Sequence, residues 1–176
     1  PAARSRPRRL HPPPTPLPAE YSDASRKAYA AGLKEARELI AQKRYDEAIA
    51  RLDALSRERP REPQARFLKS VAQSEAGRPD DAVATLTALA ADFPEMPEVH
   101  NNLAVIYAAR GGLELAKAEL ELAIAASPDY APAVENLGDV YARLAARQYE
   151  RAAELEKGKG LSPAKLKLVR DALAVH

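Results

Sequence analysis

The feature of this sequence that most restricts its fold is a repeat of 34 residues. Similar residues recur at this spacing in three series, which are Pro60, Pro94 and Pro128; Ala48, Ala82 and Ala116; and Leu52, Leu86 and Leu120. A fourth series of small residues extends the spacing through four units, at Ala36, Ser70, Ala104 and Gly138. Such a period is typical of chains in which one supersecondary unit is repeated and stacked, because stacking buries the apolar faces of neighbouring units.

Each unit is predicted to contain two helices. In the third unit, Val99, Leu103 and Ile106 follow helical spacing up to a break at Gly111 and Gly112, after which the same spacing resumes. Ala and Leu are abundant, whereas Val, Ile and Thr, which strands favour, are few. We therefore expect an all-α fold, a helical-repeat superhelix (α-solenoid) of helix-turn-helix units.

Three segments of the chain carry a family resemblance. The runs NLAVIY at 102–107 and NLGDVY at 136–141, together with YDEAI at 45–49, resemble the helix signatures of the tetratricopeptide-repeat (TPR) family. The resemblance implies a repeat domain over 21–157. Its units are expected at about 29–62, 63–96 and 97–130, with a degenerate fourth unit at 131–157.

The fourth unit has no signal for a turn between its two helices. Residues 142–148 contain no Gly, Pro, Asn or Asp, and the apolar positions between Val134 and Leu155 keep helical spacing. We therefore expect one long helix from about 131 to 156. Ser162 and Pro163 then form a start signal for a last helix, expected over 162–175, that caps the stack.

Residues 1–20 differ from the rest of the chain in composition. They carry Arg4, Arg6, Arg8 and Arg9 against Glu20, and they are rich in proline. We expect a Pro/Arg-rich tail that is extended or disordered. Because the formal net charge of the whole chain is only +2, the repeat region is close to neutral. No nucleic-acid partner is expected for such a surface.

Residues that carry catalytic or metal chemistry are sparse. The chain has no Cys, and its three histidines, His11, His100 and His176, do not pair at a metal-ligand spacing. No apolar run is long enough to cross a bilayer. We therefore expect a noncatalytic protein with no metal, no cofactor and no membrane insertion.

By the resemblance, the first helix of each unit lines a concave groove that binds a peptide. The positions that this places in the groove are Arg37, Phe67, Glu98, Asn101, Asn102, Val105, Glu135, Asn136, Asp139 and Arg143. Asn102 and Asn136 lie one repeat apart, so their amides either bond to an extended peptide backbone or bond to a neighbouring helix. Phe67 has the alternative of a place in the core.

The resemblance also bears on the chemistry of the ligand. Family members that clamp a C-terminal carboxylate place Lys, Asn and Arg across three successive first helices. In this chain, the residues at those places are Leu33, Arg37, Leu68, Glu98 and Asn102. A carboxylate clamp is therefore not expected.

Two classes of function remain. The first is a protein-protein interaction scaffold or adaptor that holds an extended peptide or protein segment in the groove. The alternative is a self-assembling structural protein, a homo-oligomer in which the tail of one copy enters the groove of another, with Arg4–Arg9 against Glu98, Glu135 and Asp139.

The expected compartment rests on composition. Arg outnumbers Lys and Ala is abundant, a usage typical of a high-GC bacterium. A Pro-rich tail before a repeat domain resembles the mature start of some exported bacterial repeat proteins. We expect a periplasmic location, with the cytoplasm as the alternative.

Overall fold

The computed structural model describes residues 22–157 and 159–174, so the expected tail at 1–20 lies outside the described residues. Within them, eight helices and no strand are present, which confirms the all-α prediction. The helices are α1 (Asp23–Ala41), α2 (Tyr45–Glu58), α3 (Gln64–Glu75), α4 (Pro79–Asp92), α5 (Pro97–Ala109), α6 (Leu113–Ala126), α7 (Ala131–Leu155) and α8 (Ser162–Leu173). The first helix begins at Asp23, earlier than the expected unit start near residue 29.

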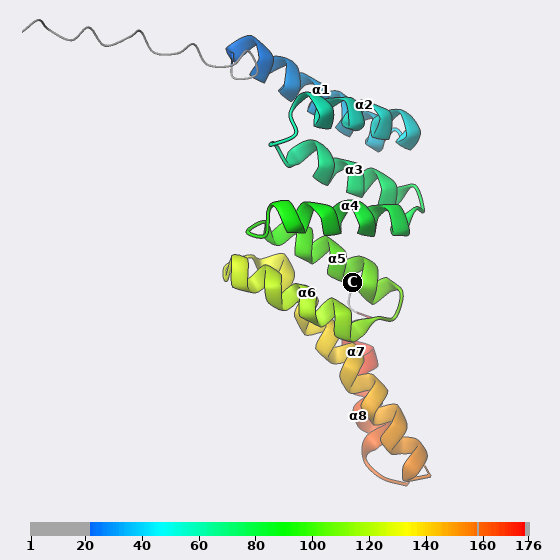
Figure 1. The fold of residues 1–176 in the computed structure, drawn as a ribbon. Helices are drawn as coiled ribbons and strands as arrows, with labels where there is room; N and C mark the ends of the chain where they lie inside the picture. Colours follow the sequence, from blue (N-terminus) through cyan, green and yellow to red (C-terminus); the bar gives the residue numbers. More distant parts are fainter. Residues whose placement is uncertain (1–21, 158, 175–176) are drawn as a thin grey trace, which may run out of the picture.

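The helices stack in antiparallel pairs along one direction of the molecule (Figure 1). The pairs α1 with α2, α3 with α4, and α5 with α6 follow one another, and α7 continues the stack. The odd-numbered helices α1, α3, α5 and α7 are the first helices of their units and form one layer. The second helices α2, α4 and α6 form the other layer.

The turns inside the first three units share one backbone geometry. Lys43, Gly77 and Gly111 lie 34 residues apart and have φ values of 59°, 73° and 78°, in the left-handed region. Each turn is closed by the same backbone hydrogen bond, for example from Gly112 N to Tyr107 O at 2.9 Å. This is the Schellman type of helix C-terminus, in which the left-handed position favours glycine because glycine has no Cβ.

The fourth unit lacks that turn. The position equivalent to Gly111 is Ala145, which lies inside α7, a single helix of 25 residues. This confirms the prediction of one uninterrupted helix. Arg147 of α7 donates a hydrogen bond to the carbonyl oxygen of Gly111 at 2.8 Å, which ties the long helix to the turn of the preceding unit. Helix α7 extends past the stack, and α8 lies alongside it (Figure 1).

The core consists of three apolar clusters spread along the stack. The first lies between α1, α2 and α3 around Leu52, the second between α4 and α5 around Leu86, and the third between α5, α6 and α7 around Leu120. Ala104 and Ala116 are 1% and 0% exposed and both belong to the third cluster. Small side chains at these positions let the helix backbones approach closely.

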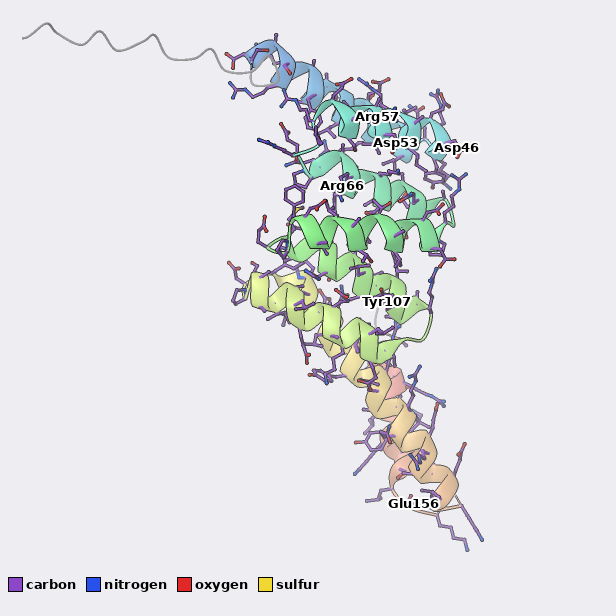
Figure 2. The ribbon with its side chains drawn as sticks, viewed as in Figure 1. Asp46, Asp53, Arg57, Arg66, Tyr107 and Glu156 are labelled. Atoms are coloured by element: carbon purple, nitrogen blue, oxygen red, sulfur yellow. The ribbon has the colours of Figure 1, made fainter. Side chains whose placement is uncertain are left out.

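Ion pairs connect successive units at the surface. Arg78 contacts Asp46 at 2.6 Å, and Arg110 contacts Asp80, which lies one repeat after Asp46, at 2.7 Å. In the same way Lys69 of α3 reaches back to Asp53 of α2 at 2.6 Å. Figure 2 shows Asp46 and Asp53 along α2, above α3. Lys69 therefore has an ionic partner on the neighbouring helix, although the equivalent residue of the third unit is Leu103.

Candidate functional site

Two adjoining pockets lie between the first helices of the second, third and fourth units. One has a volume of about 190 Å³ and lies between α3 and α5. The other has a volume of about 210 Å³ and lies between α5 and α7. Val105 of α5 lines both pockets and is 50% exposed, so it forms the wall that they share. Together the two pockets form one groove, which we call the concave groove.

The pocket between α3 and α5 has an apolar base and a polar rim. Val71, Leu86 and Ile106 supply the apolar surface, and Glu75 and Asn102 supply polar groups. Among the residues that the structure describes, the side-chain amide of Asn102 has no hydrogen-bond partner. Asn102 is half-buried, so its amide faces the pocket with donors and an acceptor to spare.

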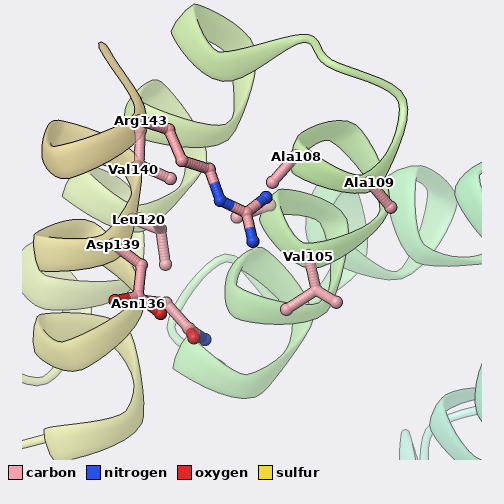
Figure 3. Close-up of a pocket in the computed structure, with 9 residues that line it drawn as sticks. Val105, Ala108, Ala109, Leu120, Asn136, Asp139, Val140 and Arg143 are labelled. Atoms are coloured by element: carbon pink, nitrogen blue, oxygen red, sulfur yellow. The ribbon is translucent and has the colours of Figure 1, made fainter. Parts of the chain in front are cut away.

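The pocket between α5 and α7 is hollow because α5 presents small side chains to it. Ala104, Ala108 and Ala109 line the α5 side, and α7 contributes polar side chains on the opposite side, which are Asn136, Asp139 and Arg143. Figure 3 shows the guanidinium of Arg143 extending from α7 toward Ala108 across this pocket. The pocket therefore combines an apolar surface with an amide, a carboxylate and a guanidinium group.

Asn136 is engaged within the protein. Its side-chain nitrogen donates a hydrogen bond to the side-chain oxygen of Asn101 at 2.8 Å, which joins α7 to α5. Asn101 itself is only 7% exposed. The two asparagines that recur one repeat apart therefore differ, because Asn136 connects two helices whereas Asn102 is open to the groove.

The structure brings half of the predicted groove residues into the pockets, namely Asn102, Val105, Asn136, Asp139 and Arg143. Two predicted residues face the helix interfaces instead of the pockets. Asn101 is buried rather than exposed, and Phe67 packs against the core cluster of α4 and α5, which was its alternative. Asn101 lies at the interface with α7, where it accepts the hydrogen bond from Asn136, and Phe67 lies at the interface with α4 and α5.

The other three predicted residues lie outside both pocket linings. Arg37 is exposed on α1, one unit before the groove. Glu98 and Glu135 lie near the starts of α5 and α7, one helical turn before Asn102 and Asp139 respectively. Burial and, to a smaller extent, the carboxylate of Glu98 raise the pKa of Tyr130, the residue that precedes α7. Glu98 therefore lies close to the beginning of α7.

Sequence reasoning missed several pocket residues, among them Ser70, Ser74 and Glu75 on α3 and the alanines of α5. The 34-residue offset could have found them. Val71 precedes Val105 by one repeat, and Glu75, Ala109 and Arg143 occupy equivalent positions in successive units. Alanine and serine side chains do not indicate a binding site by their chemistry, however. The pocket that the small side chains leave open is found only from the arrangement of the helices in space.

Two kinds of site are absent from the described part of the chain. No group of three or more His, Cys, Asp or Glu side chains within residues 22–157 and 159–174 is placed to hold a metal ion. Nor does any helix described there combine the length and the apolar character that a membrane span needs.

Helices stacked in antiparallel pairs in this way define the class of helical-repeat proteins. Two family models, both described as tetratricopeptide repeat, match this chain, one over residues 33–73 and the other over 73–139. The chain is a tetratricopeptide-repeat protein. No curated protein is significantly similar to it in sequence.

Solved structures with the same fold include one from Thermus thermophilus, described as a thermophilic TPR protein. It is 24% identical with a TM-score of 0.60, and the alignment covers 83% of each chain. The Yersinia enterocolitica type III secretion chaperone SycD in complex with a peptide of the translocator YopD is 15% identical. Its TM-score is 0.60, and the alignment covers 69% of this chain and 98% of SycD.

A third similar structure is the first TPR of Spaghetti (RPAP3) bound to the HSP90 peptide SRMEEVD. It is 18% identical with a TM-score of 0.60, and the alignment covers 68% of this chain and 94% of that one. At these identities the likeness establishes the shared fold.

Proposed function

We propose that this chain is a noncatalytic protein-interaction scaffold that binds an extended peptide segment in the concave groove. The observation that carries the proposal is the pair of adjoining pockets that meet at Val105. An extended segment places successive side chains several ångströms apart, so one segment can fill both pockets in turn. The open amide of Asn102 is placed to bond to the backbone of that segment.

Two of the similar structures support this proposal, because each is a complex with a peptide. SycD is bound to a peptide of YopD, and the first TPR of RPAP3 is bound to an HSP90 peptide. The acidic HSP90 peptide is not a good model for the ligand of this chain. Leu33, Leu68 and Glu98 stand where a carboxylate clamp needs polar and basic side chains, and Glu98 would repel an acidic peptide.

The proposal is tested with a random peptide library displayed on phage and selected against the full chain. Val105→Glu should abolish binding of the selected peptides, because it places a charge on the wall between the pockets. Leu122→Glu is the matched control, since Leu122 is 51% exposed on α6 and lines neither pocket. Fluorescence anisotropy with a labelled selected peptide measures both variants, and equal affinity for the two would contradict the proposal.

The second candidate function is self-assembly through residues 1–20 of a neighbouring copy. The observation that favours it is the acidic character of Glu98, Glu135 and Asp139 along the first helices, opposite in sign to the Pro/Arg-rich tail. Sedimentation velocity over a range of protein concentrations separates the two functions. Self-assembly requires a mass that increases with concentration, whereas a scaffold for external segments remains a monomer.

A further inference from the structure

Two carboxylates without ion-pair partners lie along one edge of the concave groove. Glu98 belongs to the first turn of α5, and Glu135 lies one turn into α7. Within the part of the chain that the structure describes, neither forms a salt bridge. Glu98 lies on the same helix face as Asn102 and Val105, which follow it by four and seven residues. Where α5 and α7 form this edge, it therefore carries two carboxylates beside the pockets.

The described part of the chain begins at the same edge. The first helices α1, α3, α5 and α7 run in the same direction, because each is separated from the next by one antiparallel second helix. Their starts therefore lie along one edge, and residue 22 is at the start of α1. A segment that leads from residue 21 toward α7 passes the starts of α3 and α5 on its way.

The length of residues 1–20 fits this path. Packed helices lie about 8–10 Å apart, and α1 contacts α3 as α5 contacts α7, so the three steps from α1 to α7 amount to at least about 30 Å. A proline-rich segment favours an extended conformation that rises about 3.1 Å per residue, so residues 10–20 span about 34 Å. Arg6, Arg8 and Arg9 precede this span, which brings them to the carboxylates of α5 and α7.

We propose that residues 1–20 dock along the concave groove of their own chain, with the arginines against Glu98 and Glu135, and so compete with an external peptide. This inference rests on the proposed function, since it concerns access to the same groove. Docking within one chain is favoured over docking between copies. A short linker gives the tethered segment an effective concentration of about the millimolar range, well above that of neighbouring copies in dilute solution.

The absence of cysteine from the chain permits a direct test in the full-length protein. Leu10→Cys is combined with Val105→Cys in the groove, or with Leu122→Cys as the control of equal exposure on α6. A short bis-maleimide crosslinker is added at several protein concentrations. The expected result is a severalfold higher yield of crosslinked monomer for the Val105→Cys pair, independent of protein concentration. Equal yields for the two pairs would overturn the proposal, and so would crosslinked dimers that increase with concentration.

A second measurement examines the charges. Replacing Arg6, Arg8 and Arg9 together by Glu should reduce the crosslinking, and the matched triple replacement by Lys should preserve it. The Glu variant should also bind the labelled selected peptide about threefold more tightly or better, because a larger fraction of its grooves is open. An unchanged affinity and crosslinking yield in the Glu variant would overturn the docking while leaving the proposed function intact. The proposed function fails separately, if Val105→Glu does not weaken peptide binding.

Discussion

At the level of single residues, two asparagines with the same place in the repeat have different surroundings. Asn136 donates to the nearly buried Asn101, so removing it leaves an acceptor that water reaches poorly. Asn102 has no such partner among the described residues and lines a pocket instead. The 34-residue spacing alone predicts the same role for Asn102 and Asn136. The two differ because Asn136 has a hydrogen-bond partner on the neighbouring helix, which is Asn101.

This difference leads to a prediction for the two single variants. Asn136→Ala should lower the free energy of unfolding by about 1–3 kcal/mol, because Asn101 loses its donor. Asn102→Ala should change stability by less than about 0.5 kcal/mol but weaken binding of a selected peptide about two- to tenfold. Chemical denaturation and fluorescence anisotropy measure the two effects. A destabilised Asn102→Ala variant with unaltered peptide affinity would show that Asn102 is structural.

The left-handed turn at Lys43 gives a second prediction. A non-glycine residue in this conformation costs roughly 1–2 kcal/mol, and glycine loses part of that advantage through its freedom in the unfolded chain. Lys43→Gly should therefore stabilise the protein by about 0.5–1 kcal/mol. The reverse change Gly77→Ala should destabilise by a similar amount, since a Cβ there meets no atom within 4 Å and only the backbone is strained. Denaturation midpoints that move in the opposite directions would contradict this account.

The close helix contact around Ala116 gives a third prediction. Ala116 is fully buried in the cluster of α5, α6 and α7, so Ala116→Leu should overpack it and cost about 1–3 kcal/mol. Ala118→Leu is the control, because Ala118 is exposed on the same helix and the substitution changes the helix propensity by the same amount. Both variants are compared by urea denaturation. If Ala116→Leu unfolds at the wild-type midpoint, the helix interface at this position is not close-packed.

At the level of elements, α7 distinguishes this chain from a regular array. The residue that would form the turn is Ala145, which favours helix, whereas Gly77 and Gly111 supply the turn in the units before it. The absence of a residue suited to the left-handed region therefore lets the two helices of a regular unit merge into one. The consequence is a helix that extends past the stack and carries α8 beside it.

A proline in α7 tests this continuity. Ala145→Pro should remove one helical hydrogen bond, clash with the preceding turn and lower stability by about 3 kcal/mol or more. Ala145→Gly is the control for helix propensity alone and should cost only about 1 kcal/mol. Circular dichroism during thermal unfolding compares the two. If both variants lose the same small amount of stability, the chain has a turn at this position.

The elements could be predicted from the sequence more fully than the site. Periodicity and turn residues indicated the helix pairs and the long helix at 131–156, because both signals are local. The inward orientation of Asn101 and Phe67 depends on how neighbouring helices pack, and the hollow beside Ala104 and Ala108 depends on side chains that are small. Neither property is encoded in the spacing along one helix.

At the level of the whole molecule, the three core clusters follow one another along the stack. Each unit packs on its neighbours in sequence, so no cluster joins the first unit directly to α6 or α7 within the described residues. Stability in such an array is approximately a sum of unit terms and interface terms between neighbours. Loss of packing in one cluster should therefore remain largely local.

Paired truncations at opposite ends of the stack test this expectation. Leu52 and Leu120 occupy equivalent positions, are 0% and 1% exposed, and belong to the first and third clusters. Each Leu→Ala change should remove about 2–5 kcal/mol from its own cluster. In native-state hydrogen exchange, Leu52→Ala should reduce the protection of α1 and α2 while α6 and α7 keep more of theirs, and Leu120→Ala should show the reverse. Both variants replace Leu by Ala, so a difference between them in which helices lose protection results from the position of the residue along the array. A uniform loss of protection along the chain in both variants would instead show that the array unfolds as one cooperative unit.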